Sequence, residues 1–337
     1  MYYKGCPPEL LAEISSAAHT IQNYPSPAAE ELNQVASKRF QLESDQFLFT
    51  NGATEAFYLI AHVFSGKSAA IVAPTFSEYE DACKIHGFDY HMVDKAELTS
   101  GDYQLVFICN PNNPDGSIIS TPELTQLIGS MPSTTFVIDE AYIEFTNQIE
   151  SVAPLVNHFD NLIVVRSLTK TFTIPGIRLG YIVTSSGIIE QLLSKKMPWS
   201  VNALAIQAGL QLFEHYDRWL FNVEELLEET RGFIRELAAI RWLEVKSSHT
   251  SFFLVELKKG KASALKEYLA TQHGILIRDA TNFKGLEGEY IRLATKRLGT
   301  EVTDLGTLGD VMATLKELRD KESSIEMIIT PIMDMYA

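Results

Sequence analysis

Short apolar runs recur between helical stretches over the first two-thirds of the chain. The runs are apolar throughout rather than at alternate positions, which is typical of strands covered on both faces, as in a parallel sheet flanked by helices. They are FLFT at 47–50, AAIVA at 69–73, QLVFIC at 104–109, TTFVID at 134–139, NLIVVR at 161–166 and GYIVT at 180–184. This pattern predicts an open α/β sheet.

The pattern changes in the last third of the chain. Residues 203–240 are predicted to be helical, with apolar residues on one stripe and acidic residues mostly off it. Shorter segments follow: strands at 251–257, 275–279 and 290–296, and helices around 261–272 and through 301–321. We therefore expect an N-terminal arm over 1–24, a large domain over 25–235 and a smaller α+β domain over 236–337. The tail 322–337 has no strong period and is not placed.

Composition and charge narrow the classes of function. The chain has 337 residues, 46% hydrophobic and 21% charged, which is ordinary for a globular protein. A net charge of −15 argues against nonspecific binding to nucleic acid or anionic membranes, so an anionic substrate would need a local basic pocket.

Cysteine usage and the N-terminus suggest a compartment. Cys6, Cys83 and Cys109 are scattered, without a CxxC pair, so we expect a reducing compartment and no zinc site. No apolar run approaches the ~18 residues of a membrane span. The start MYYKGCPPELL lacks the pattern of a signal peptide. A cytoplasmic protein without nucleic-acid or membrane partners is expected.

Polar residues collect at the predicted carboxyl ends of strands, where ligands bind in open α/β sheets. FLFTNGATEAF reads as strand, turn and helix, so the backbone N–H groups of Ala53 and Thr54 would form an anion site. NPNNPDG is first a turn signal, but it could present the amide of Asn113 to a ligand. FVIDEAYIEF places Asp139 and Glu140 directly after a buried strand, where a carboxylate needs a partner. No cluster nearby has metal-ligand spacing, so a metal is not expected.

Lys170 lies in VVRSLTKTFTIPGIRLGYIVT at 164–184, among hydroxyl residues and eight residues before Arg178. A lone lysine would be read as solvated. Together, however, the strand ends supply an anion site, the aromatic pair Phe76 and Tyr79, an amide, an acid, a phenol, a lysine and an arginine. This set fits pyridoxal 5′-phosphate. The expected partners are Ala53, Thr54, Ser167 and Arg178 for the phosphate, Phe76 for the ring face, Asn113 and Tyr142 for the phenolic oxygen, Asp139 for the ring nitrogen and Lys170 for the aldehyde.

The chain resembles the pyridoxal-phosphate-dependent aminotransferases of fold type I, class I/II, over nearly its full length. The resemblance rests on NPNNPDG, DEAY, SLTK with Arg178 eight residues after the lysine, and YIRLA. It implies a mostly parallel central sheet flanked by helices, with a smaller α+β C-terminal domain.

The same resemblance implies roles for individual residues. The catalytic residues would be Lys170, Asp139 and Tyr142, and Thr169 would join the cofactor-binding set. Arg278 and Arg292, with Asn113, would bind the anionic ends of the substrate, since arginine matches carboxylate and phosphate. Tyr24, in NYPSP, would reach the cofactor phosphate of the neighbouring subunit in a homodimer with a shared active site.

Within the family the chain is similar to two groups, the L-threonine-O-3-phosphate decarboxylases of cobalamin biosynthesis and the histidinol-phosphate aminotransferases. The stretches RSLTKTFTIPGIRLGY, KMPWSVNALA and ILIRDATNFKGLEGEYIR favour the decarboxylases. We therefore expect decarboxylation of L-threonine O-3-phosphate to (R)-1-aminopropan-2-yl phosphate, with histidinol-phosphate or a related aminotransferase as the alternative. The cofactor residues do not distinguish these reactions. A non-catalytic half of a transcription regulator is disfavoured by the short N-terminal arm and the net charge of −15.

Overall fold

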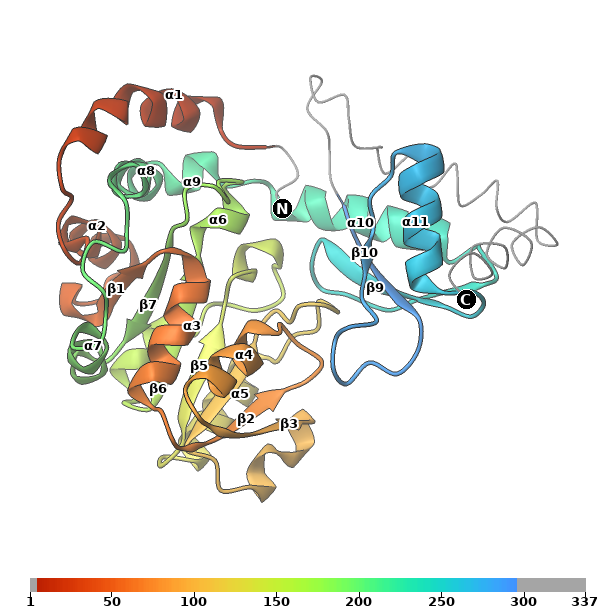
Figure 1. Ribbon diagram of the computed structural model, residues 1–337, viewed down its shortest axis with the longest axis horizontal. Coiled ribbons are helices and arrows are strands. Elements are labelled where there is room, and N and C mark those ends of the chain that lie inside the picture. Colours follow the sequence, from red (N-terminus) through yellow and green to blue (C-terminus); the bar gives the residue numbers. More distant parts are fainter. Residues whose placement is uncertain (1–4, 296–337) are drawn as a thin grey trace.

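The computed structural model describes residues 5–295, which form two β-sheets (Figure 1). The large sheet has seven strands in the order β1-β7-β6-β5-β4-β2-β3. Their bounds are β1 Phe47–Thr50, β2 Ser68–Val72, β3 Asp89–Val93, β4 Leu105–Cys109, β5 Thr135–Asp139, β6 Leu162–Ser167 and β7 Gly180–Thr184. The predicted α/β fold with a mostly parallel sheet is confirmed, although β7 runs antiparallel to both of its neighbours, β1 and β6.

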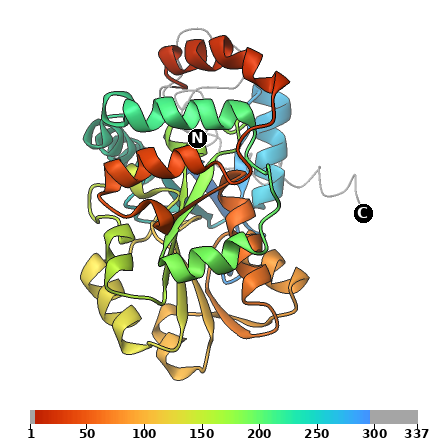
Figure 2. The ribbon, with the colours of Figure 1, turned by 90° about the vertical axis from the view of Figure 1, so that its left-hand side faces the viewer.

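Helices cover both faces of the large sheet, as Figure 2 shows. One face is covered by α3 Gly52–Val63, α4 Glu78–Ile85 and α7 Ser186–Leu193, and the other by α2 Glu30–Phe40, α5 Thr121–Ser130 and α8 Ala203–Glu214, with α1 Pro8–Ser16 packed on α8. Successive strand residues point into different cores. In β5, Phe136 and Ile138 pack into one core, while Val137 packs into the other. Both faces are therefore buried, which explains the continuous apolar runs in the sequence.

The direction of the strands places the polar residues at their carboxyl ends along one edge of the sheet. Strands β2, β4, β5 and β6 are parallel, and β1 has the same direction because it is antiparallel to β7. Their carboxyl ends therefore lie at the same edge, and the segment that enters β7 also starts there. This edge is where ligands bind in open α/β sheets.

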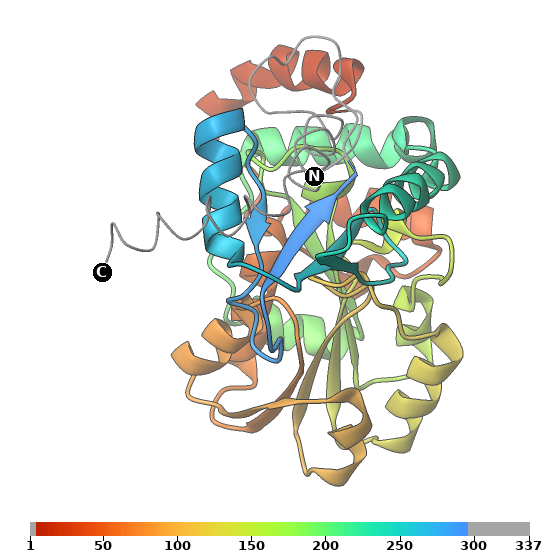
Figure 3. The same cartoon turned by 90° about the vertical axis from the view of Figure 1, so that its right-hand side faces the viewer.

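The small sheet is antiparallel and has the order β10-β11-β9-β8 (Figure 3). Its strands are β8 Leu243–Val245, β9 Phe252–Leu257, β10 Arg278–Asp279 and β11 Tyr290–Ala294. Helix α11 Ala262–His273 packs on it through Leu265 and Leu269, and shares a core with Phe233 and Leu237 from the end of α10 Val223–Leu237. The predicted domain boundaries stay a prediction.

The single helix predicted over 203–240 is wrong in detail, because α8, α9 Tyr216–Trp219 and α10 Val223–Leu237 are separate helices. Leu220 is extended, with ψ 141°, and ends α9. The side chain of Asn222 then accepts hydrogen bonds from the N–H groups of Glu224 and Glu225, which starts α10 as an N-cap does. The predicted helix 301–321 and the tail 322–337 lie outside the described residues.

The remaining short elements are turns of 3-10 helix at Ala17–Gln22, Ser44–Gln46, Lys95–Ser100, Ile143–Phe145 and Ala153–Asn157, together with α6 Leu168–Thr171. Within 5–295, every helix is too short or too polar to cross a membrane.

Candidate active site

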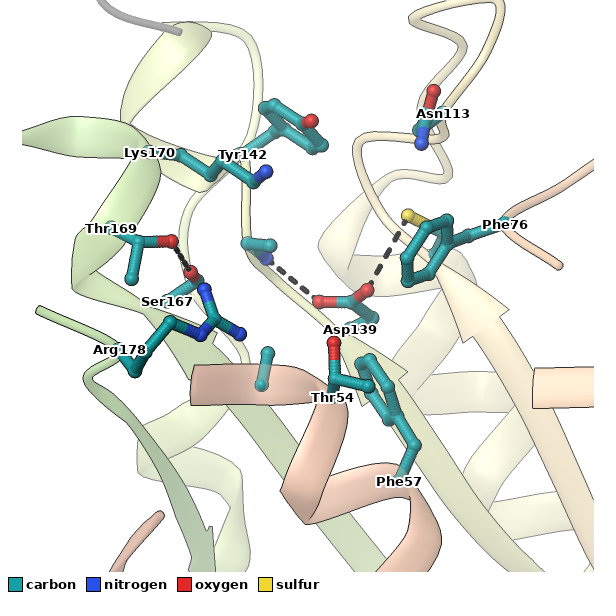
Figure 4. A pocket seen from close by; sticks show the side chains of 13 residues that line it. Thr54, Phe57, Phe76, Asn113, Asp139, Tyr142, Ser167, Thr169, Lys170 and Arg178 are labelled. Carbon is teal, nitrogen blue, oxygen red and sulfur yellow. Dashed lines mark hydrogen bonds between the residues drawn. The ribbon is translucent and has the colours of Figure 1, made fainter. Parts of the chain in front are cut away.

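The predicted anion site lies where α3 begins. The side chain of Arg178 lies against this helix start, and Gly52, with φ +78°, leaves room for it (Figure 4). A Cβ on Gly52 would stand 2.5 Å from Nη2 of Arg178, and a Cβ on Gly180 would stand 2.6 Å from the backbone nitrogen of Ala53. Both glycines thus allow a close approach that a side chain would block. A helix N-terminus beside a guanidinium suits a phosphate.

Lys170 lies on the short helix α6, directly after β6, and is partly buried. Burial lowers its pKa, the nearby charges of Arg292 and Arg178 lower it further, and Asp139 opposes them. A lysine with a lowered pKa has more of the neutral amine, which is the nucleophile that attacks an aldehyde. Its surroundings therefore favour covalent bond formation.

Asp139 ends β5 and is 4% exposed. Its Oδ1 accepts a hydrogen bond of 2.9 Å from the N–H of Ala141, and its Oδ2 accepts one from the hydroxyl of Tyr79. Burial raises the pKa of Asp139 to about 6, although these hydrogen bonds and the charge of Lys170 lower it. A buried carboxylate of this kind gains from an adjacent cation, such as a protonated ring nitrogen.

Tyr79 was predicted only as part of an aromatic pair, and its contact with Asp139 was not foreseen. It is fully buried, stacked on Phe107 and edge-on to Phe57 and Phe76. Cys109 also contacts Asp139, with its Sγ 3.9 Å from Oδ2. The sequence indicates that Phe76 and Tyr79 lie close together near the start of α4. It does not indicate which strand end their side chains face, so the contact with Asp139 could not be predicted.

A buried charge network lies behind the site. Arg166 contacts Glu140 at 3.3 Å and also contacts Glu144, which accepts further hydrogen bonds from Thr171 and Tyr216. Glu140, which was expected to need a partner, also accepts from Ser151 and from the N–H of Val152. The network joins the turn after β5 to helix α6, so it fixes Asp139 relative to Lys170.

All predicted cofactor residues except Tyr24 line one pocket, and Lys170, Asp139 and Arg178 point into it (Figure 4). The predicted residues that line it are Ala53, Thr54, Phe76, Asn113, Asp139, Tyr142, Ser167, Thr169, Lys170 and Arg178, and Phe57, Cys109 and Ala141 complete the lining. Tyr24 is 87% exposed and lies on a separate groove beside Trp199, with ring centroids 5.4 Å apart.

Arg278 and Arg292 line a second pocket that shares Phe76, Asn113, Tyr142 and Lys170 with the first. They lie opposite each other on β10 and β11. Nη1 of Arg292 donates to Oδ1 of Asn113, while Nη2 of Arg278 donates to Oδ1 of Asn282 at 3.1 Å. Burial and the charge of Arg278 lower the pKa of Arg292. The two arginines thus present positive charge next to Lys170.

The side chains and backbone groups that line the first pocket fit pyridoxal 5′-phosphate. The start of α3 and Arg178 are cationic at one end, Asp139 is a buried acceptor, and Lys170 is an amine with a lowered pKa. Among the described residues, no group of three or more His, Cys, Asp or Glu is placed to hold a metal ion. The individual roles of these side chains stay predictions.

The fold and this pocket define an enzyme that uses pyridoxal 5′-phosphate, of a kind that includes decarboxylases and aminotransferases. The chain belongs to the aminotransferase class I and II family, whose model matches residues 2–297.

Three relatives illustrate the range of reactions. The crystal structure of L-threonine-O-3-phosphate decarboxylase from Porphyromonas gingivalis is 33% identical, with a TM-score of 0.89, and the match covers 95% of this chain and 98% of that one. The threonine-phosphate decarboxylase of Salmonella typhimurium is 29% identical over 91% of this chain and 88% of its own. A histidinol-phosphate aminotransferase of Thermoanaerobacter sp. (strain X514) is 33% identical over 84% of this chain and 83% of its own.

Proposed function

We propose that this enzyme removes the carboxylate of L-threonine O-3-phosphate as carbon dioxide and releases (R)-1-aminopropan-2-yl phosphate. The observation that carries the proposal is the pair Arg278 and Arg292, which face each other beside Lys170 in a protein of net charge −15. A small substrate with a carboxylate and a phosphate would use both guanidinium groups. The similarity to proteins named threonine-phosphate decarboxylase supports the same substrate.

The positions of the two arginines suggest which anion each one binds. Arg292 is the more buried, contacts Asn113 and influences the pKa of Lys170, so we assign it the carboxylate next to the reacting carbon. Arg278 lines the same pocket but is exposed, so we assign it the phosphate.

The chain's own groups have separate tasks in the reaction. When bound, the cofactor supplies a ring that takes up the electron pair of the broken bond. Asp139 holds the proton on the ring nitrogen, and Lys170 holds the cofactor and is placed to return a proton to the substrate carbon. Arg292 binds the carboxylate and Arg278 binds the phosphate, and together they orient the substrate so that the bond between the carboxylate and that carbon is the one that breaks.

Transamination of histidinol phosphate is the alternative, because its substrate also has an amine and a phosphate. The identity of 33% to a histidinol-phosphate aminotransferase favours it as the second candidate. That substrate has no carboxylate, so Arg292 would bind a carboxylate only in the other half-reaction, in which 2-oxoglutarate becomes glutamate. The two reactions therefore differ in whether the phosphorylated substrate has a carboxylate for Arg292 to bind.

The decisive experiment compares both reactions in one preparation. The holoenzyme is incubated with O-phospho-L-threonine, and separately with histidinol phosphate and 2-oxoglutarate, while carbon dioxide and glutamate are measured. Carbon dioxide from the first mixture supports the proposal. Glutamate from the second mixture, without carbon dioxide from the first, shows that the enzyme is the aminotransferase.

Substitution of the arginines refines the test. Arg292→Ala and Arg278→Ala should each lower kcat/KM by about tenfold to a hundredfold, since a charged hydrogen bond contributes roughly 1.5–3 kcal/mol. Arg278→Ala should reduce the preference for phosphothreonine over threonine, whereas Arg292→Ala should lower activity on both. Arg241→Ala, at an exposed position before β8, serves as the matched control.

We also propose that the enzyme is a homodimer in which Tyr24 completes the site of the partner. Ile21, Tyr24 and Trp199 line one groove and are 67%, 87% and 49% exposed. Large apolar side chains gathered at a surface favour an interface.

A further inference from the structure

The second pocket contains a positive charge that was not predicted. Its lining includes Asn282, Phe283 and Lys284, three consecutive residues of the loop between β10 and β11. Of the described residues that line this pocket, only Glu80 is acidic, whereas Lys170, Arg278, Lys284 and Arg292 are basic. A pocket with this balance of charge selects anions.

Glu80 lies on α4, which packs on the large sheet, and its side chain is 7% exposed. Its carboxylate is bound by the ammonium group of Lys284, by that of Lys84 at 2.8 Å and by the hydroxyl of Tyr90 at 2.8 Å. Burial would raise the pKa of Glu80, but these three donors lower it to about 2. The carboxylate of Glu80 is therefore ionised at neutral pH and holds the two ammonium groups in place.

The loop that carries Lys284 is held in place by its own backbone. Ala280 donates to the carbonyl of Tyr290 at 2.8 Å, and Leu286 donates to the carbonyl of Phe283 at 3.2 Å. Gly285 has φ +88°, and a Cβ there would stand 3.3 Å from the Cβ of Ala73. The loop thus passes close to the segment after β2, and Lys284 is held at the pocket by both its backbone and Glu80.

Lys84 and Lys284 share the same carboxylate but differ in position. Lys84 does not line the pocket, whereas Lys284 does. An ammonium group has three donors, so Lys284 can contact Glu80 and a second anion at once. Arg278 lines the same pocket, and its guanidinium lies 5.7 Å from the ring centroid of Phe283, the residue before Lys284.

We propose that Lys284 is a specificity-determining residue, whose ammonium group joins Arg278 in binding the phosphate of the substrate while Glu80 holds it in position. This inference rests on the proposed function only in that the substrate carries a phosphate, which is true of both candidate reactions. O-Phospho-L-threonine would bring three negative charges, and Arg292, Arg278 and Lys284 would supply three positive ones.

The test compares Lys284→Met with Lys84→Met in the holoenzyme, with Lys284→Arg as the conservative variant. The measurements are KM and kcat for O-phospho-L-threonine and L-threonine, and the binding of O-phosphoethanolamine, followed by the visible absorbance of the bound cofactor. O-Phosphoethanolamine has an amine and a phosphate but no carboxylate, so it reports on the phosphate end alone.

Lys284→Met should raise KM for phosphothreonine and the dissociation constant of phosphoethanolamine by about tenfold, with little change in kcat or in KM for threonine. Lys84→Met should leave these values near those of the wild type, and Lys284→Arg should retain most of the phosphate preference.

An unchanged phosphate preference in Lys284→Met would overturn the inference. Equal losses of phosphate binding in Lys284→Met and Lys84→Met would also overturn it. Such a result would show that the two lysines act by neutralising Glu80, and not through direct contact between Lys284 and the phosphate. If the wild type releases no carbon dioxide from phosphothreonine, the proposed function fails, but phosphoethanolamine binding by the two variants still decides the role of Lys284.

Discussion

Replacing Asp139 by asparagine should stabilise the cofactor-free chain at neutral pH. An ordinary aspartate has a pKa of about 3.9, and burial raises that of Asp139 to about 6. The difference of about two units corresponds to roughly 3 kcal/mol. Between these two pKa values the folded chain binds more protons than the unfolded chain, so its free energy of unfolding falls as the pH rises from about 4 to 6. Asparagine has nearly the same shape without the charge and avoids this cost.

The assay is urea unfolding of both proteins after removal of the cofactor. The variant should have little advantage near pH 4 and an advantage of about 2–3 kcal/mol near pH 7. Asp160→Asn, at an exposed position, is the control. A variant that is no more stable than wild type near pH 7, or equally favoured near pH 4, would refute the argument that burial of the carboxylate carries the cost.

The same substitution should have the opposite effect on the loaded enzyme. A protonated ring nitrogen beside Asp139 would offset the cost of burying its charge, so the cofactor should stabilise the wild type more than Asp139→Asn. The variant should still bind the cofactor but lose most of its rate, because the ring nitrogen would no longer keep its proton. A rate near that of the wild type would contradict this role.

Three further predictions concern the cofactor site. Lys170→Ala should abolish turnover and the visible absorbance of the covalently held cofactor; borohydride reduction that labels a different lysine would contradict the assignment. Gly52→Ala should weaken cofactor binding by about tenfold or more, because its Cβ would stand 2.5 Å from Nη2 of Arg178. Gly66→Ala is the matched control, since Gly66 also has a positive φ but no atom within 4 Å of its Cβ, and equal losses in both would refute the steric reason. Tyr24→Phe should speed loss of the cofactor without unfolding the chain, as measured by dialysis and circular dichroism; a fully active monomer in light scattering would rule out the shared site.

The large sheet was predictable because its central strands are covered on both faces. That burial requires continuous apolar runs, and the predicted strands agree with the structure within one or two residues. Strand β3 was missed because it lies at the edge of the sheet, where Asp89 and His91 are exposed and the apolar run is lost. The break between α9 and α10 was missed because an apolar stripe continues on both sides of it, while the cap at Asn222 is a local feature.

The cofactor pocket was predictable because most of its residues end a strand or closely follow one, and parallel strands bring their carboxyl ends together. Three contacts were not predictable: Tyr79 with Asp139, Arg166 with Glu144, and Lys284 with Glu80. Each joins side chains on different elements. The last pair is separated by 204 positions in the sequence. Spacing along one element carries no information on such pairs, since they depend on how whole elements pack.

The residues expected to bind the cofactor and those expected to bind the substrate phosphate lie in different parts of the chain, which bears on how such enzymes diverge. The residues that line the cofactor pocket lie between Ala53 and Arg178. Arg278, Lys284 and Arg292 lie in the β10–β11 hairpin, within a stretch of fifteen residues. We therefore expect exchange of that hairpin to alter which anion is recognised while the residues around Lys170 stay the same.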